Sequence, residues 1–210
     1  MFKPFLQFSN QLLQNLQTCQ LCELEKPHFH SICADCWQQL PWLNQQIQRQ
    51  EIDIQVACEY RYPINRIIQK FKYEQHLHFQ NLLAGTLLEL RLPKVQAIVP
   101  MPISTTRLFE RGYNQSLVIA KIVARHLNVP IWQPISRLEQ HSQKGLTRLE
   151  RLEHIEQQFH ISTDSKRCYR RVLIVDDVVT TASSIHALKQ KLEQLGCQKV
   201  YASCIAAAKS

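Results

Sequence analysis

The stretch that decides the fold runs from Arg171 to Ser184 and reads RVLIVDDVVTTASS. Its first part, residues 172–175, is a continuous apolar run, which is typical of a strand buried on both faces of a parallel sheet. Two aspartates, Asp176 and Asp177, follow, and a short segment rich in hydroxyl groups then leads into a helix expected over residues 184–195. Because ligands of open α/β sheets bind beyond the carboxyl ends of the strands, this segment predicts a binding site.

The residues that follow the strand have the chemistry needed to hold a sugar phosphate. Backbone N–H groups at the start of a helix, together with hydroxyl groups, form an anion site. Here the anion is expected on Thr180, Thr181, Ala182, Ser183 and Ser184. The carboxylates of Asp176 and Asp177 can accept hydrogen bonds from the vicinal hydroxyls of a ribose. The segment predicts a ribose 5-phosphate site. The alternative is a doubly wound sheet whose acidic strand end binds nothing.

Strands and helices alternate through most of the remaining sequence. Further strands are expected over 52–60, 95–100 and 199–208, and helices over 34–40, 64–71, 77–92 and 113–127. Residues 131–161 are mixed, with a capping box from Thr147 to Glu150. Apolar strands that alternate with amphipathic helices predict an α/β fold with a mostly parallel, twisted sheet and helices on both faces.

Four of the eight cysteines form two CxxC pairs separated by ten residues: Cys19, Cys22, Cys33 and Cys36. This spacing predicts a structural zinc site, because each pair places two thiolates on one tight turn. His28 and His30 lie between the pairs, and we interpret them as loop residues because the ligand set is already complete. A site with four cysteine ligands has no open position for a substrate. We therefore expect a small zinc module over residues 1–45 and a second domain over residues 46–210.

Composition restricts the class of protein. The chain has 210 residues, of which 45% are hydrophobic and 20% charged, as in an ordinary globular protein. No apolar run reaches the roughly 18–20 residues that a membrane span requires, and the first 18 residues lack the apolar core of a signal peptide. A cytoplasmic location without a membrane span is the expectation. With four glycines in the whole chain, GxGxxG and Walker-type loops are excluded.

The net charge of +8 is unevenly distributed along the chain. Residues 61–125 carry ten basic and three acidic side chains, so a polyanionic partner is expected to contact this part. In the helix over 64–72, Arg66, Lys70 and Lys72 lie opposite the apolar face, and Tyr62 and Tyr73 flank them and could stack on unpaired bases. This pattern predicts binding of single-stranded DNA. The alternatives are a solvated basic face, or charges that face the sugar-phosphate site.

The stretch VLIVDDVVTTASS resembles the signature of type I phosphoribosyltransferases, in which an apolar strand and two acidic residues precede TTGxT. Ala182 replaces the glycine of that pattern and Ser184 replaces its last threonine. An alanine is acceptable there unless the backbone angle φ is positive. The resemblance implies a type I phosphoribosyltransferase fold, which binds phosphoribosyl pyrophosphate (PRPP).

Other motifs are more specific and resemble the ComF family of competence-associated, phosphoribosyltransferase-like bacterial proteins. They are the four cysteines, Phe71-Lys72-Tyr73, the PMP motif at residues 100–102 followed by ERGYNQS at 110–116, and QKGLTRLER at 143–151. The resemblance extends from about Cys19 to Ala206, and its motifs keep their order.

The resemblance implies a role for each matching residue. Asp176 and Asp177 would contact the ribose hydroxyls directly or through Mg²⁺, and the loop from Thr180 to Ser184 would hold the 5-phosphate. Arg107 and Arg111 would bind pyrophosphate, for which the forked guanidinium group is well suited. Residues 143–151 would form a hood loop that closes over the substrate. Its Lys144, Arg148 and Arg151 would complete the electrostatic clamp, or Arg148 and Arg151 would pair with glutamates on the same helix.

The resemblance to the ComF family implies a competence protein that acts in natural transformation, in the uptake and handling of incoming single-stranded DNA. Two other functions stay open on the residues alone. One is an active phosphoribosyltransferase that moves ribose 5-phosphate from PRPP to an unknown base, since no acceptor pocket is readable from the sequence. The other is a zinc adaptor that docks helicase or recombination-mediator proteins.

Overall fold

The structure, a computed structural model, describes residues 18–138, 158–162 and 168–208, and the chain forms two compact units, Met1–Leu40 and Pro41–Ser210. The first unit holds the four clustered cysteines and a short helix, α2 (Ala34–Gln38), which begins after Cys33. The division after Leu40 leaves the whole of strand β1 (Trp42–Arg49) in the second unit. The domain boundary that the sequence predicts after residue 45 falls inside this strand.

The second unit is built on a five-stranded sheet with the order β1-β2-β7-β6-β3. Its other strands are β2 (Ile52–Glu59), β3 (Ala97–Pro100), β6 (Arg171–Val179) and β7 (Lys199–Ala207). Strand β1 is antiparallel to β2, and the other three pairings are parallel. The predicted mostly parallel sheet is therefore confirmed. Strand β1 itself was not predicted, because it is an edge strand whose apolar residues Leu43 and Ile47 are only partly buried among exposed glutamines and Asn44.

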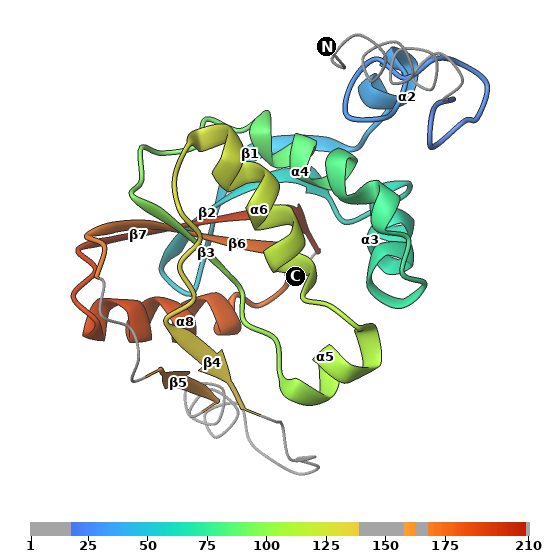
Figure 1. Cartoon of the computed structure of the whole chain (residues 1–210). Helices are drawn as coiled ribbons and strands as arrows, with labels where there is room; N and C mark the ends of the chain where they lie inside the picture. The colour runs from blue at the N-terminus through green and yellow to red at the C-terminus, as the bar shows by residue number, and fades with distance from the viewer. Residues whose placement is uncertain (1–17, 139–157, 163–167, 209–210) are drawn as a thin grey trace, which may run out of the picture. The chain divides into compact units, whose positions relative to one another are not determined.

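Helices cover both faces of the sheet (Figure 1). Helices α4 (Gln80–Leu88) and α6 (Gln115–Leu127) pack on one face, and α8 (Ser183–Gln194) packs on the other. Val172 and Ile174 of β6 share a buried apolar cluster with Leu188 of α8. Helix α3 (Ile64–Tyr73) and a short 3₁₀ helix (Leu77–Phe79) precede α4. Among the described residues, no helix combines the length and the apolar composition needed to cross a membrane.

Three short elements were not predicted. Helix α5 (Thr105–Arg111) has no buried residue, so it lacks the apolar stripe by which a helix is recognised. Strands β4 (Ile135–Arg137) and β5 (Phe159–Ile161) form a separate antiparallel pair of three residues each, which is too short to show a periodicity. The capping box predicted at Thr147 lies outside the described residues.

The sheet places the two aspartates at its topological switch point. Strand β3 ends at Pro100, opposite Val175 of β6, whereas β6 continues to Val179 because it stays paired with β7. The prediction that the strand ends before Asp176 was thus wrong by four residues. The chain after β3 leads to α6 on one face of the sheet, and the chain after β6 leads to α8 on the other. At such a switch point a ligand-binding crevice is expected between the two strand ends.

Candidate functional site

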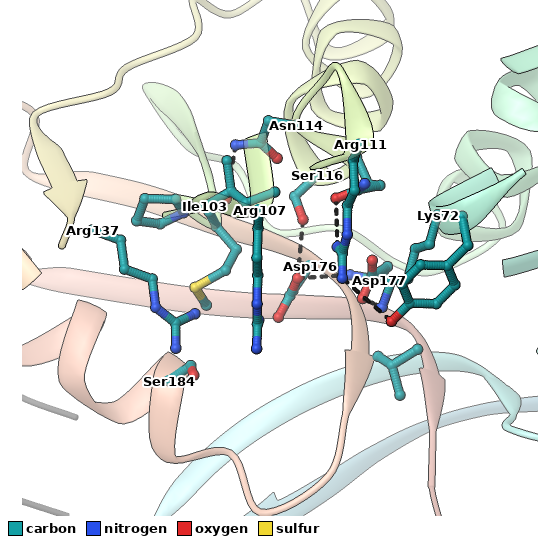
Figure 2. Close-up of a pocket in the computed structure, with 15 residues that line it drawn as sticks. Lys72, Ile103, Arg107, Arg111, Asn114, Ser116, Arg137, Asp176, Asp177 and Ser184 are labelled. Atoms are coloured by element: carbon teal, nitrogen blue, oxygen red, sulfur yellow. Dashed lines mark hydrogen bonds and ion pairs between the residues drawn. The ribbon is translucent and has the colours of Figure 1, made fainter. Parts of the chain in front are cut away.

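A cavity of about 350 Å³, called the pocket below, lies at this crevice (Figure 2). Its walls come from α3, from the loop after β3 with the adjoining helices α5 and α6, and from β4, β6 and the first residues of α8. Segments that are far apart in the sequence therefore supply one site. Its lining includes the predicted residues Arg107, Arg111, Asp176, Asp177 and Ser184.

The aspartate pair, Asp176 and Asp177, forms the floor of the pocket. Asp177 is 7% exposed, and its Oδ1 lies 2.7 Å from Nζ of Lys72. Oδ1 of Asp176 accepts hydrogen bonds from the Ser116 hydroxyl at 3.0 Å and from the Asp177 backbone N–H at 2.9 Å. Burial, with the negative charge of Asp177 as the second cause, raises the pKa of Asp176 to about 7. One carboxylate is thus neutralised by a lysine, while the other titrates near neutral pH.

Three arginines extend into the pocket: Arg107, Arg111 and Arg137 (Figure 2). Arg111 donates to Oε1 of Gln115 at 3.0 Å and to the Tyr73 hydroxyl at 3.3 Å, and it stacks on the Tyr73 ring. Among the described residues, none of the three arginines forms an ion pair with a carboxylate. Their charges are therefore available to an anionic ligand, and a guanidinium binds phosphate oxygens in a forked geometry.

Arg137 is a pocket residue that the sequence analysis missed. It lies on β4 and donates from Nε and Nη2 to Oε1 of Gln158, at 3.3 and 3.2 Å, while its guanidinium stacks on Phe159. Burial and the charge of Arg107 lower its pKa. No sequence signal marked Arg137, because it belongs to no motif and its strand has three residues.

The segment Thr180–Ser184, predicted from the sequence to hold a phosphate and called the phosphate loop below, runs from the end of β6 into the first two residues of α8. Ser184 lines the pocket, and the hydroxyls of Thr181 and Ser183 lie 3.0 Å apart in a mutual hydrogen bond. Ala182 has a φ of 65°, in the left-handed region, and it caps the N-terminus of α8. The alanine that replaces the glycine of the family pattern therefore has a positive φ, so the replacement has an energetic cost. An L-residue in this conformation costs roughly 1–2 kcal/mol.

Two residues at the turn between β1 and β2 support this loop and were also missed. Arg49 donates from Nη1 to the Thr180 carbonyl at 2.7 Å and from Nη2 to the Ala208 carbonyl at 2.9 Å. The Gln50 side-chain amide donates to the Ser183 hydroxyl at 2.9 Å. Neither contact was predictable, because strand β1 was not expected.

The structure separates the three basic residues predicted on α3. Lys72 lies in the pocket against Asp177, so its placement on a DNA-binding face with the other two is wrong. Arg66 is exposed and pairs with Glu74 at 3.1 Å, and Lys70 is half-buried. The hood residues Lys144, Arg148 and Arg151 lie outside the described residues.

In the first unit, the sulfur atoms of Cys19, Cys22, Cys33 and Cys36 all lie within 4.8 Å of one another and can hold one metal ion. The sulfurs of Cys22 and Cys33 are 3.8 Å apart. A Zn–S distance of about 2.3 Å places the ligands of a tetrahedron about 3.8 Å apart, so this spacing fits zinc. The backbone N–H groups of Leu21 and Cys36 each approach a cysteine sulfur at 3.4 Å.

Part or most of the chain is similar to several known proteins. Residues 114–210 match the family described as phosphoribosyl transferase domain. The chain is 26% identical over 201 residues to competence protein F of Haemophilus influenzae, with 90% of this chain and 83% of that protein covered. It is 27% identical over 201 residues to DNA utilization protein YhgH of Escherichia coli K12, with 89% and 82% covered. Against the crystal structure of orotate phosphoribosyltransferase from Aeropyrum pernix, the TM-score is 0.37 at 18% identity, with 68% of this chain and 64% of that chain covered.

The domain match, the strand order and the pocket at the switch point define an α/β protein with the type I phosphoribosyltransferase fold. Similarity along about nine tenths of the chain to proteins named competence protein F and DNA utilization protein YhgH agrees with the more specific resemblance to the ComF family.

Proposed function

We propose that the chain acts as a ComF-type protein in natural transformation and that its pocket binds a ribose 5-phosphate that carries further phosphates, of the PRPP type. The observation that supports this most strongly is the composition of the pocket. Three arginines without ion-pair partners among the described residues, an aspartate pair and the start of a helix converge on one cavity.

Each part of such a ligand has a matching group. The phosphate loop supplies backbone N–H groups for the 5-phosphate. Asp177 accepts hydrogen bonds from the ribose hydroxyls. Arg107, Arg111 and Arg137 bind the pyrophosphate and neutralise its charge. Confined positive charge of this kind also attracts the anion from solution.

Titration calorimetry with PRPP tests this proposal. We expect one PRPP per chain, with Arg107→Gln and Arg137→Gln each weakening binding about tenfold, because a charge-assisted hydrogen bond contributes about 1.5 kcal/mol or more. Arg61→Gln is the matched control, since Arg61 is exposed and pairs with Glu59 away from the pocket lining. No binding at millimolar PRPP would show that the pocket has another ligand.

The same site could bind PRPP without turnover or could transfer its ribosyl group. In a transferase, the bond from the anomeric carbon to the pyrophosphate oxygen breaks, pyrophosphate leaves with the electron pair, and a bond to the acceptor forms. We propose binding without turnover. Measurement of pyrophosphate release in the presence of nucleobases separates the two, and sustained release above the protein-free blank would establish the enzyme.

We propose that single-stranded DNA contacts the outer side of α3. Arg66 is exposed there, and Tyr62, just before the helix, is 78% exposed, which suits stacking on an unpaired base, whereas the ring of Tyr73 is stacked by Arg111 at the pocket. The relatives' names, which refer to competence and DNA utilization, favour a DNA role. Binding should be weak and salt-dependent, with a log–log slope of about −0.7 for each phosphate contact.

The DNA proposal predicts that the double variant Arg66→Glu/Lys70→Glu loses DNA binding and keeps its PRPP affinity. Lys189→Glu on α8 is the control variant. A parallel loss of DNA and PRPP binding would place the DNA in the pocket. Helicase or recombination-mediator proteins stay predicted partners.

We also propose that Cys19, Cys22, Cys33 and Cys36 bind a structural Zn²⁺, given their sulfur spacing. A location in the cytoplasm suits these thiols, because they persist in reduced form there.

A further inference from the structure

The ion pair between Lys72 and Asp177 lies inside the pocket. It joins α3 to β6 over a sequence separation of 105 residues, with Nζ and Oδ1 2.7 Å apart. The side chains are 18% and 10% exposed. Burial alone would lower the pKa of the Lys72 ammonium, but the negative charge of Asp177 raises it, and the net shift is upward. A lysine that is buried to this extent keeps its charge because it is paired. The position beside Asp177 therefore already holds a cation.

The same position is where a magnesium ion would bind if the aspartate pair contacted the ribose through Mg²⁺, which is one of the two contacts that the resemblance to phosphoribosyltransferases implies. Mg²⁺ requires oxygen ligands at about 2.0–2.1 Å in nearly ideal octahedral geometry. Oδ1 of Asp177 is occupied by the lysine ammonium, and Oδ1 of Asp176 accepts two hydrogen bonds, from Ser116 and from the Asp177 backbone. A divalent ion on the Asp177 oxygen would also lie against the ammonium charge. With Oδ1 of both aspartates engaged and the Lys72 ammonium beside them, the pair is a poor donor set for Mg²⁺.

We infer that Lys72 takes the place of the metal ion, so that the pocket binds its sugar phosphate without a divalent cation. The inference rests on the sugar-phosphate site proposed above and specifies how its charge is balanced. Lys72 neutralises Asp177 and keeps further N–H donors for a ribose hydroxyl or a phosphate oxygen.

The remaining charges of the pocket support this assignment. Arg107, Arg111 and Arg137 provide three more positive charges, so four cationic side chains face the two aspartates. In a metal-dependent site, the ion itself neutralises much of the pyrophosphate charge. Here the arginines can do so, because none of them is engaged by a carboxylate among the described residues.

The experiment compares PRPP binding by the full chain, measured by calorimetry, in excess Mg²⁺ and in EDTA. For the wild type, we expect the two dissociation constants to differ by less than about fivefold, or about 1 kcal/mol. Lys72→Met frees the Asp177 carboxylate for a metal ion. In EDTA this variant should bind PRPP at least about tenfold more weakly than the wild type, and Mg²⁺ should restore much of the loss. Lys189→Met, which removes a half-buried lysine paired with Glu193 at 3.8 Å outside the pocket lining, should behave like the wild type.

Several results would overturn the inference, and they separate it from the proposed function. Wild-type binding that disappears in EDTA contradicts the inference and leaves the PRPP site intact. Absence of binding under both conditions refutes the PRPP site and the inference with it. Equal affinity of Lys72→Met and wild type in EDTA shows that Lys72 contributes nothing. If Lys72→Met does not fold, as judged by thermal melting, the wild-type comparison decides alone, and Lys72→Met/Asp177→Asn offers a neutral replacement of the pair.

Discussion

Replacing Arg49 by methionine should loosen the phosphate loop while leaving the rest of the pocket unchanged. Arg49 lies at the end of β1, outside the pocket lining, and its guanidinium group joins the Thr180 carbonyl to the Ala208 carbonyl. Methionine keeps much of the apolar stem and removes both donors. We predict a specific loss of affinity for the 5-phosphate.

The size of the loss follows from the two hydrogen bonds. A hydrogen bond from a charged donor contributes about 1.5–3 kcal/mol when it is well shielded. Arg49 is half-buried, and its bond to Thr180 is exposed, so solvent screening reduces this value. We therefore expect the loss of both hydrogen bonds to weaken the ordering of the loop by about 1–2 kcal/mol, which corresponds to a roughly 5- to 30-fold loss of affinity.

Two ligands distinguish a local effect from a general one. Calorimetry with ribose 5-phosphate should show the 5- to 30-fold loss, about 1–2 kcal/mol, because this ligand depends on the loop. Inorganic pyrophosphate should bind Arg49→Met as it binds the wild type, since the arginines of the pocket are not altered. Arg61→Met, an exposed arginine paired with Glu59, is the control for lost charge. Unchanged affinity for ribose 5-phosphate, or an equal loss for both ligands, would refute the role of Arg49 as a support for the loop.

Three further predictions follow from the described contacts. Asp177→Ala should weaken PRPP binding about 10- to 150-fold, because a charge-assisted contact is lost. Thr181→Ala should weaken it less, because the backbone amides of the loop remain. A larger loss for Thr181→Ala than for Asp177→Ala in calorimetry would contradict these roles. Burial raises the pKa of Asp176 from its ordinary 3.8 to about 7, so the folded protein holds this proton more tightly than the unfolded chain does. The proton's contribution to the free energy of unfolding is therefore fully present below about pH 4 and is lost as the pH rises through 7. Asp176→Asn should therefore raise the melting temperature near pH 8 and leave it unchanged near pH 4; an equal change at both pH values would show that titration is not the cause. Elemental analysis of reduced protein should find about one zinc per chain, and Cys19→Ser should release it while PRPP still binds; protein that contains no zinc would disprove the metal assignment.

The sequence allowed the central part of the fold to be predicted, because the information there is local. The continuous apolar run at 172–175 marks a buried parallel strand, and the apolar positions of the helix at 64–71 repeat with helical spacing. Asp176, Asp177 and Ser184 could be placed in the pocket because a parallel strand brings its carboxyl end to a known edge of the sheet. Arg107 and Arg111 follow another strand that ends at the same edge.

What could not be predicted depends on contacts between distant segments. Arg49 supports the phosphate loop from a strand whose polar edge position hides its periodicity. Arg137 enters the pocket from a strand of three residues. Lys72 has the same local appearance as Arg66, and only the tertiary fold, which brings α3 to the pocket, places it beside Asp177. The positive φ of Ala182 likewise results from the turn that α8 requires.

The central claim is that this pocket binds a ribose 5-phosphate through its loop and its arginines, and a crystal structure of the full chain with PRPP tests it most directly. The account predicts the 5-phosphate on the backbone N–H groups of the phosphate loop, a ribose hydroxyl within hydrogen-bond distance of Asp177, and the pyrophosphate on Arg107 and Arg137. PRPP bound elsewhere on the chain, or an empty pocket at saturating PRPP, would contradict it.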